Sequence, residues 1–224
     1  HFVIDGLSYA EWVRVYRSSL REKDVFVSES DKGIYDAINK GIARSSERIV
    51  GVLNADDTYA STKVLAMVHE LFSMEGADVV YGDLNYVNDQ RSVVRRWRAG
   101  VFRPWKLYFG WMPPHPTVFV RRSVFDRFGV YDPQFKIAGD YEYLLRILFS
   151  RDLSIRYLPR CIVNMRLGGV SNKSLKSILR KSMEDVRAMR RHGLFPLLAL
   201  PLKNLSKVSQ FFSVAHVVSR RKHE

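Results

Sequence analysis

The stretch Ile49-Val50-Gly51-Val52-Leu53-Asn54-Ala55-Asp56-Asp57-Thr58 decides the fold of this chain. Its apolar first half predicts a buried strand, and that strand stops at two adjacent carboxylates. Acids at the carboxyl end of a buried strand lie where open α/β sheets bind their ligands. Neighbouring carboxylates repel each other, and a cation between them and a diphosphate relieves that repulsion. The alternative is a solvated turn in which Asp57 or Thr58 caps the following helix.

The segments around this stretch alternate between strand and helix. The pattern predicts strands at residues 2–4, 25–27, 49–53 and 79–81, with helices at 9–20, 32–43 and 61–73. Beyond a basic loop at 91–106, it predicts strands at 117–120, 155–158 and 162–165 and helices at 123–128 and 141–149. We therefore expect an α/β domain over residues 1–170, with a mostly parallel central sheet flanked by helices, and a tail of basic amphipathic helices over 171–224.

Composition limits the classes of function. The 224 residues are 46% hydrophobic, which is enough for a sizeable core, and the formal net charge of +13 predicts an anionic partner. Nucleic acid, a phosphate-bearing substrate and an anionic membrane surface all fit that charge. The single cysteine, Cys161, excludes an intramolecular disulfide and a cysteine-based zinc cluster, and it favours a reducing compartment. The sequence shows no signal-peptide pattern and no apolar run approaching the ~18 residues of a membrane span.

Two further groups of residues have side chains suited to catalysis. Asp140 follows Gly139 at the start of a predicted helix, where an acid either caps the helix or acts as a general base toward a hydroxyl. His115 lies between Pro114 and Pro116, just before a strand. An isolated histidine is more often structural, but this one is held stiffly and could contact a metal, a phosphate or an acceptor.

The end of the chain is strongly basic. From Lys173 onward it contains twelve Lys or Arg residues and three acids, with apolar runs at residues 194–200 and 211–215 between them. Such a pattern is typical of helices that lie in an anionic membrane interface. The alternative is a helix packed on the domain with a solvated outer face.

Four blocks in order, residues 28–41, 52–57, 115–117 and 138–142, together resemble the family-2 glycosyltransferases. These are inverting enzymes of the GT-A fold, and the similarity is greatest to bacterial members that build colanic acid, O-antigen and capsular polysaccharides. The resemblance spans roughly residues 2–169. It implies a hexosyltransferase-type enzyme that moves a sugar from a nucleotide-diphospho-sugar to a saccharide or polyprenyl-diphosphate-linked acceptor during cell-surface polysaccharide biosynthesis.

The same resemblance implies roles for individual residues. Asp140 matches the catalytic base, and Asp57 matches the ligand of a divalent metal, Mg²⁺ or Mn²⁺, in a DXD-like motif whose leading acid is replaced by Asn54. The positions that match donor or nucleotide contacts are Asp5, Asp31, Lys32, Asn39, Lys40, Asn54 and Asp56. Acceptor or phosphate contacts are expected at His115, Arg96 and Arg98. We expect a cytoplasmic enzyme, peripheral on the inner face of a bacterial plasma membrane.

The chain departs from the family pattern at its beginning. Family members start with an apolar strand, a turn and a helix, whereas this sequence begins in mid-strand at His1. We expect those elements to precede His1 in a longer protein. Two other hypotheses remain: an inactive nucleotide- or carbohydrate-binding relic of the same fold, and a basic nucleic-acid-binding protein. The second is less favoured because the sequence contains no helix-turn-helix, zinc-finger or RNA-binding signature.

Overall fold

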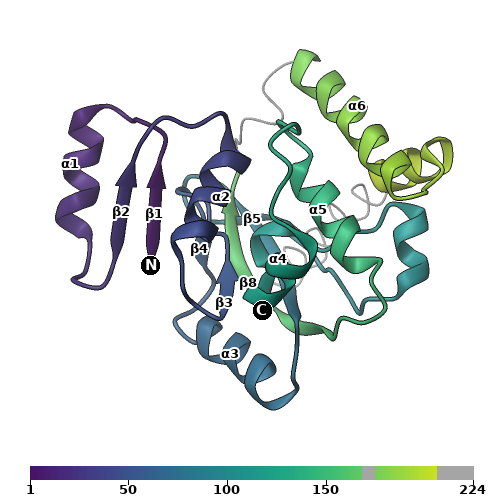
Figure 1. Cartoon of the computed structure of the whole chain (residues 1–224), viewed down its shortest axis with the longest axis horizontal. Coiled ribbons are helices and arrows are strands. Elements are labelled where there is room, and N and C mark those ends of the chain that lie inside the picture. The colour runs from purple at the N-terminus through teal and green to yellow at the C-terminus, as the bar shows by residue number, and fades with distance from the viewer. Residues whose placement is uncertain (168–174, 206–224) are drawn as a thin grey trace, which may run out of the picture.

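The computed structural model describes residues 1–167 and 175–205 of the chain. In these ranges the strands form two sheets, one of two strands and one of six, and helices pack around them (Figure 1). In the smaller sheet, β1 (Phe2–Asp5) pairs in parallel with β2 (Val25–Ser28), and α1 (Ala10–Ser19) connects them. Helix α2 (Ile34–Arg44) follows and packs against β1 so closely that a methyl group on Gly41 would lie 3.3 Å from Ile4.

The larger sheet has the strand order β3-β7-β5-β8-β4, with β6 also paired to β5. Its strands are β3 (Ile49–Gly51), β4 (Thr58–Tyr59), β5 (Val79–Val87), β6 (Val93–Trp97), β7 (Phe119–Arg121) and β8 (Ile155–Arg166). Only β5 and β8 run parallel, and the other four pairings are antiparallel. The predicted α/β class is confirmed, but the expectation of a mostly parallel sheet is wrong for this sheet. One reason is that β5 and β6 are joined by a short hairpin, and a hairpin can only be antiparallel.

Two apolar clusters form the core. One lies under α4 (Arg122–Phe128) and α5 (Gly139–Leu148), with Tyr81, Tyr143 and Leu145 almost fully buried. In the other, α3 (Val64–Met74) packs on β5 and β8 through residues such as Phe72 and Ile162. Truncating one of these buried aliphatic side chains to Ala would cost about 2–5 kcal/mol.

Three strands differ from the prediction. The sequence suggested separate strands at 155–158 and 162–165, but β8 continues through an irregularity at the exposed Pro159 and Arg160. The expected basic loop contains β6, because residues 93–97 pair with β5. Strand β3 is shorter and less buried than expected, since only its β7 edge is paired among the described residues.

The C-terminal part packs on the domain core. Helix α6 (Leu175–Arg191) contacts α5 and buries Ala188 and Met189, and residues 196–205 form a further helix (Figure 1). The expected domain boundary at residue 170 and the second apolar run at 211–215 lie outside the described residues. In the described part of the chain, every helix is too short or too polar to cross a membrane.

Candidate active site

The turn after β3 is held by a bond between two of its own side chains. Asn54 donates its side-chain amide to Oδ2 of Asp57 at 2.8 Å, and the backbone N–H of Asp57 returns to the Asn54 carbonyl at 3.1 Å. The backbone N–H of Arg166, at the end of β8, donates to Asp57 Oδ1 at 3.2 Å. Asp57 is therefore fixed between its own turn and β8, and the side-chain amide of Asn54 holds its carboxylate in place.

The two acids of this turn differ in environment. Asp57 is buried, and this burial raises the pKa of its carboxyl, opposed by the hydrogen bonds from Asn54 and Arg166. Asp56 is exposed. Each oxygen of Asp57 accepts one of these bonds, and a carboxylate offers about four lone-pair sites, so capacity for a cation remains. Hard carboxylate oxygens suit Mg²⁺ or Mn²⁺, which commonly bind one or two protein carboxylates together with substrate phosphates. Asp57 therefore has the chemistry to hold such an ion as a single protein carboxylate, while among the described residues no group of three or more His, Cys, Asp or Glu side chains could hold a metal.

A second acidic site forms where the small sheet ends. Asp5 accepts hydrogen bonds from the Ser28 hydroxyl at 2.6 Å and from the Ser8 backbone. Burial alone would raise the pKa of Asp5, but these bonds outweigh it and lower that pKa. Asp31 lies alongside, because a methyl group on Gly6 would overlap with its carboxylate. Asp31 thus lies beside the turn that follows Asp5, and donor contacts by these two residues stay predictions.

The loop before α2 is shaped by Gly33. Its φ of 126° is reached readily only by glycine, and its N–H donates to Asp31 Oδ1 at 2.8 Å. Lys32 is exposed, and its backbone N–H donates to Asp36 at 2.9 Å. That bond is the main cause of the lowered pKa of Asp36, and a donor contact by Lys32 stays a prediction.

Asn39 and Lys40 lie on α2 with partners of their own. Asn39 exchanges two hydrogen bonds with the backbone of Tyr131, at 2.7 and 3.0 Å. Lys40 forms ion pairs with Glu29 at 3.3 Å and Asp36 at 3.6 Å. Donor contacts by these two residues stay predictions, and they would compete with these bonds.

Asp140 lies in the first turn of α5, facing α2. Tyr35 of α2 donates its hydroxyl to Asp140 Oδ1 at 3.2 Å and to the Ile137 carbonyl at 2.8 Å. The backbone N–H of Tyr141 also donates to Oδ1, at 2.8 Å. Both bonds go to the same oxygen of Asp140, so Oδ2 is the atom better placed to take a proton.

His115 belongs to the same cluster. Its Nε2 lies 2.8 Å from the Tyr131 hydroxyl, and the Tyr131 ring stacks on Tyr35 at 5.8 Å. Burial lowers the pKa of His115, and the negative charge of Asp140 partly opposes this. The lowered pKa favours the neutral imidazole, and Tyr131 and Tyr35 link His115 to Asp140 through these contacts.

Arg96 and Arg98 lie apart from this cluster, on β6 and just after it. Burial raises the pKa of Cys161 and of Tyr157, and the positive charges of Arg96 and Arg98, respectively, partly oppose this. The Tyr157 hydroxyl donates to Asp83 at 2.7 Å. Both arginines are at least partly exposed. Their predicted contacts with acceptor or phosphate stay predictions.

A groove of about 670 Å³ separates the two sheets. Its wall includes Ile4 of β1, Val50 of β3, Ile38 of α2 and the turn residue Asn54. Among the described residues, no strand pairs with the groove-facing edges of β1 and β3. Helix α2 borders this groove with Ile34 and Ile38 and holds Asp140 through Tyr35, but of the predicted site residues only Asn54 is among the residues that line the groove.

Two tyrosines of this site escaped the sequence reasoning. Tyr35 lies in the block at residues 28–41 that resembles the family, but nothing in that block marks it as a functional residue. No local motif surrounds Tyr131. Their partners are about 100 and 16 residues away in the chain. No spacing rule connects such positions.

Comparison with known proteins agrees with this architecture. Residues 3–131 match the family model described as Glycosyl transferase family 2. The PGL/p-HBAD biosynthesis glycosyltransferase of Mycobacterium bovis (strain BCG / Pasteur 1173P2) is 29% identical over 175 residues, which cover 76% of this chain and 66% of that protein. An uncharacterized glycosyltransferase of Mycobacterium tuberculosis is 32% identical over 149 residues, covering 65% of this chain and 56% of the relative.

The fold is also that of a solved structure. Staphylococcus aureus TarS 1–349, crystallised in complex with UDP, superposes with a TM-score of 0.56 at 14% identity, covering 90% of this chain and 59% of that one. The chain thus spans less than two thirds of the length of these proteins. Since the family model covers more than half of its residues and its sheet has the GT-A architecture, the chain belongs to glycosyltransferase family 2.

Proposed function

We propose that this protein transfers a sugar from a nucleotide-diphospho-sugar to an acceptor hydroxyl, with inversion at the anomeric carbon. The observation that supports this best is α2, which lines the same groove as Asn54 and holds Asp140 through Tyr35. The Asp5–Asp31 and Asp56–Asp57 regions would bind the donor, and Asp140 would serve the acceptor.

The chemical step assigned to Asp140 is a proton transfer. Its Oδ2 takes the proton of the acceptor hydroxyl while the hydroxyl oxygen forms a bond to the anomeric carbon. The bond from that carbon to the diphosphate oxygen breaks, and the nucleoside diphosphate leaves with the electron pair. Attack opposite the leaving group inverts the anomeric centre without a covalent enzyme intermediate.

Asp57 is the proposed ligand of a divalent cation. When bound, Mg²⁺ or Mn²⁺ would neutralise charge on the diphosphate as a Lewis acid. The protein's own contribution is to keep Asp57 in place through Asn54 and Arg166.

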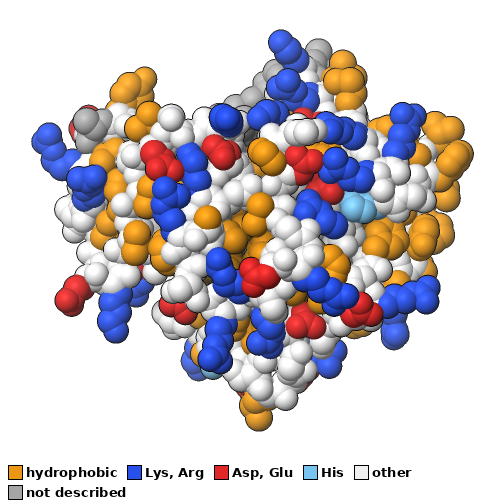
Figure 2. All heavy atoms as spheres, in the orientation of Figure 1, with side chains coloured by type: hydrophobic (Ala, Val, Ile, Leu, Met, Phe, Trp, Pro, Cys, Tyr) orange, Lys and Arg blue, Asp and Glu red, His pale blue; other side chains and the backbone are white. Residues whose placement is uncertain are grey.

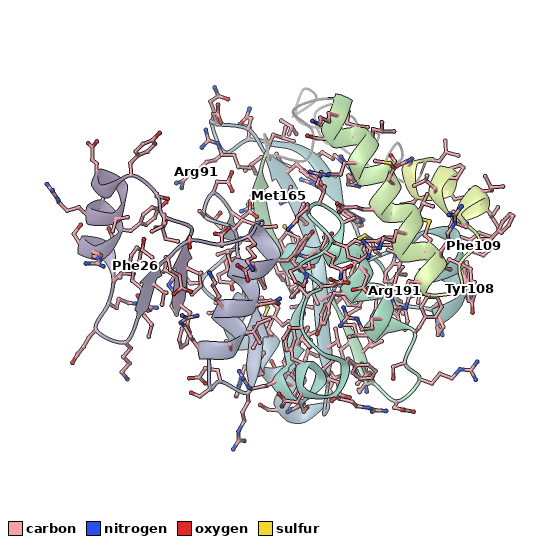
Figure 3. All side chains as sticks on the ribbon, turned by 45° about the horizontal axis from the view of Figure 1, so that its top comes forward. Phe26, Arg91, Tyr108, Phe109, Met165 and Arg191 are labelled. Carbon is pink, nitrogen blue, oxygen red and sulfur yellow. The ribbon has the colours of Figure 1, made fainter. Side chains whose placement is uncertain are left out.

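An anionic membrane is the proposed location of the acceptor. Exposed apolar side chains gather on η1 (Pro104–Phe109) and on residues 195–205, and we call this set the apolar face: Trp105, Tyr108, Phe109, Phe195, Leu197, Leu198 and Leu205. Gly110 at the end of η1 abuts Ala199 and Lys203 of the neighbouring helix. Figure 2 shows the hydrophobic atoms gathered at the right edge of the molecule, and Figure 3 shows Tyr108 and Phe109 beside that helix.

Charge favours a lipid surface for the apolar face. Residues 101–110 and 194–205 contain no acid and three basic residues, of which Arg103 is exposed, Lys106 is partly exposed and Lys203 is buried against Asp185. Apolar side chains beside cations bind anionic lipid, at about 1 kcal/mol for each cation near the surface. A polyprenyl-diphosphate-linked acceptor would be met there, on the cytoplasmic side, and Arg96 and Arg98 would contact its phosphates.

The test is a donor screen on the full-length natural protein. UDP-, GDP- and dTDP-sugars are incubated with acceptors, with Mn²⁺ or with EDTA, and products are analysed by mass spectrometry and NMR. We expect one donor to be consumed only with the metal and to give the inverted anomer. Nucleotide binding without turnover of any donor would favour the inactive relic, and tight salt-dependent binding of duplex or single strands would favour the nucleic-acid hypothesis.

A further inference from the structure

Helix α5 starts with a bond of its own, because the Tyr141 N–H in its first turn donates to Asp140. Its N-cap residue is Ala138, which has no oxygen to accept from the backbone N–H groups of the first turn. Helix starts leave such donors unsatisfied, and substituting a capping residue by Ala usually costs about 1 kcal/mol. The segment that leads into this start, residues 136–138, is held by a partner from elsewhere in the fold.

Glu184 of α6 is that partner. Its carboxylate accepts hydrogen bonds from three successive backbone N–H groups: Lys136 at 3.0 Å, Ile137 at 2.8 Å and Ala138 at 2.9 Å. Hydrogen bonds that a carboxylate accepts are charge-assisted and about twice as strong as neutral ones. Glu184 thus fixes the segment 136–138 from a position 46–48 residues further along the chain.

The same segment is fixed from its other side by the donor-binding half of the molecule. Tyr35 donates to the Ile137 carbonyl, and Lys136 Nζ donates to the Lys32 carbonyl at 2.9 Å. Gly139 passes so close to the Tyr35 ring that a methyl group there would lie 2.7 Å from it. Residues 136–138 are therefore clamped between α2 with its preceding loop and α6.

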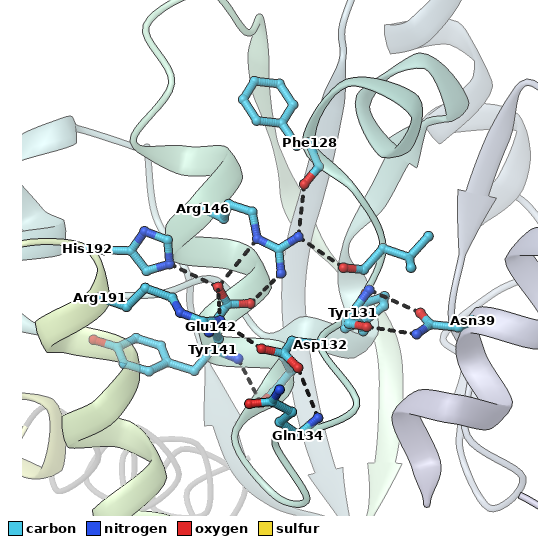
Figure 4. Close-up of polar contacts among 12 residues, drawn as sticks. Asn39, Phe128, Tyr131, Asp132, Gln134, Tyr141, Glu142, Arg146, Arg191 and His192 are labelled. Carbon is cyan, nitrogen blue, oxygen red and sulfur yellow. Dashed lines mark hydrogen bonds and ion pairs between the residues drawn. The ribbon is translucent and has the colours of Figure 1, made fainter. Parts of the chain in front are cut away.

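Helix α6 has a second, independent attachment to α5. Arg191, two turns after Glu184, reaches Glu142 at 3.3 Å and Asp132 at 2.8 Å, and His192 lies 3.1 Å from Glu142 (Figure 4). These contacts, with the buried Ala188 and Met189, keep α6 docked when Glu184 is changed. The contribution of Glu184 is consequently local to segment 136–138.

We infer that Glu184 is a positioning residue for the proposed general base: it sets the place of Asp140 relative to the donor through the segment 136–138. This inference rests on the proposed function. Displacing a catalytic group by about 1 Å can cost roughly 100-fold in rate. The effect belongs to the chemical step and not to donor binding.

The experiment compares Glu184→Ala and Glu184→Gln in the full-length protein, with kcat and donor KM expressed per folded molecule from circular dichroism. We expect Ala to lower kcat about 100-fold and Gln, which keeps one acceptor oxygen, about 10-fold, with donor KM within threefold of wild type. Glu75→Ala is the control, because Glu75 is a half-exposed acid with one ion pair, to Arg156 at 2.8 Å, away from this segment. The Gln variant carries the test if the Ala variant does not fold.

Two results would overturn the inference: a kcat within twofold of wild type for both variants, or a loss that appears as raised donor KM with unchanged kcat. Asp140→Asn in the same assay keeps the two ideas separate. If that variant is fully active, the proposed base is wrong. If it is inactive while Glu184→Ala is normal, only the positioning role fails.

Discussion

The two acidic regions of this molecule are held in place by different kinds of contact. Asp57 is anchored largely within its own turn, by Asn54 three residues earlier. Asp140 is anchored by Tyr35 about 100 residues earlier and, through its preceding segment, by Glu184 more than 40 residues later. The comparison teaches that the proposed metal side is set mainly within one turn, with one further bond from Arg166 of β8, whereas the proposed base side exists only after α2, α5 and α6 have packed.

The largest expected effect concerns the base side. Asp140→Asn keeps the shape and the bond from Tyr35 but removes the proton acceptor, so kcat should fall about 1,000-fold, within the usual range for a general base. The measurement is steady-state transfer with the best donor, alongside nucleotide affinity, which should be unchanged. If the variant retains transfer activity, Asp140 is not the general base.

A smaller loss is expected on the metal side. Asp57→Ala should lower kcat/KM roughly 100-fold, because charge developing on the diphosphate loses its stabilisation. Titration with Mn²⁺ should show weaker activation than in wild type. Asn54→Ala, which leaves the carboxylate but removes its local donor, should fall between the two proteins. If Mn²⁺ activates all three proteins equally, Asp57 does not bind the cation.

Tyr35→Phe sharpens the comparison directly. It removes the hydroxyl that bonds Asp140 and Ile137 without emptying the core, so stability should drop by about 1 kcal/mol. We expect kcat to fall about tenfold and the Mn²⁺ activation constant to stay unchanged. If the Mn²⁺ activation constant changes while kcat stays normal, the contacts that fix Asp57 and those that fix Asp140 are not independent of each other.

Low pH should lower the stability of the protein by protonating Glu142 of α5. Burial opposes ionisation of this group, but hydrogen bonds from His192 and Arg146 lower the pKa of Glu142 to about 2 from 4.5. Because its folded pKa is depressed, its stabilisation is complete above pH 4.5 and is lost as pH falls toward 2, on the order of 3 kcal/mol. The gap in Tm between wild type and Glu142→Gln should shrink across this window. A constant gap would refute the assignment.

The smallest effect on catalysis is expected from changes to the apolar face. The triple change Trp105→Ser, Phe109→Ser, Leu197→Gln should reduce co-sedimentation with phosphatidylglycerol-containing vesicles at least about tenfold and leave kcat on a soluble acceptor unchanged. The matched control is Leu65→Gln with Met74→Gln, two exposed apolar residues on α3. Equal binding to neutral vesicles, or a concentration-dependent dimer in gel filtration, would contradict an anionic lipid partner.

Local patterns in the sequence were sufficient for much of this protein. The alternation of strand and helix predicted most elements to within a few residues, since apolar periodicity reflects which face of an element is buried. The blocks at residues 28–41, 52–57, 115–117 and 138–142 predicted the family. Asn54, Asp56 and Asp57 could be grouped in advance because one turn contains them all.

Only the tertiary structure decided the rest. The antiparallel pairing of β7 with both β3 and β5 joins strands that no short hairpin connects, and a strand's own residues do not encode its neighbour. The stacking of Tyr35 on Tyr131, and the reach of Glu184 to residues 136–138, arise from contacts across 46 to about 100 positions of chain. Such contacts form because packing brings distant faces together, so they leave no periodic trace in the sequence.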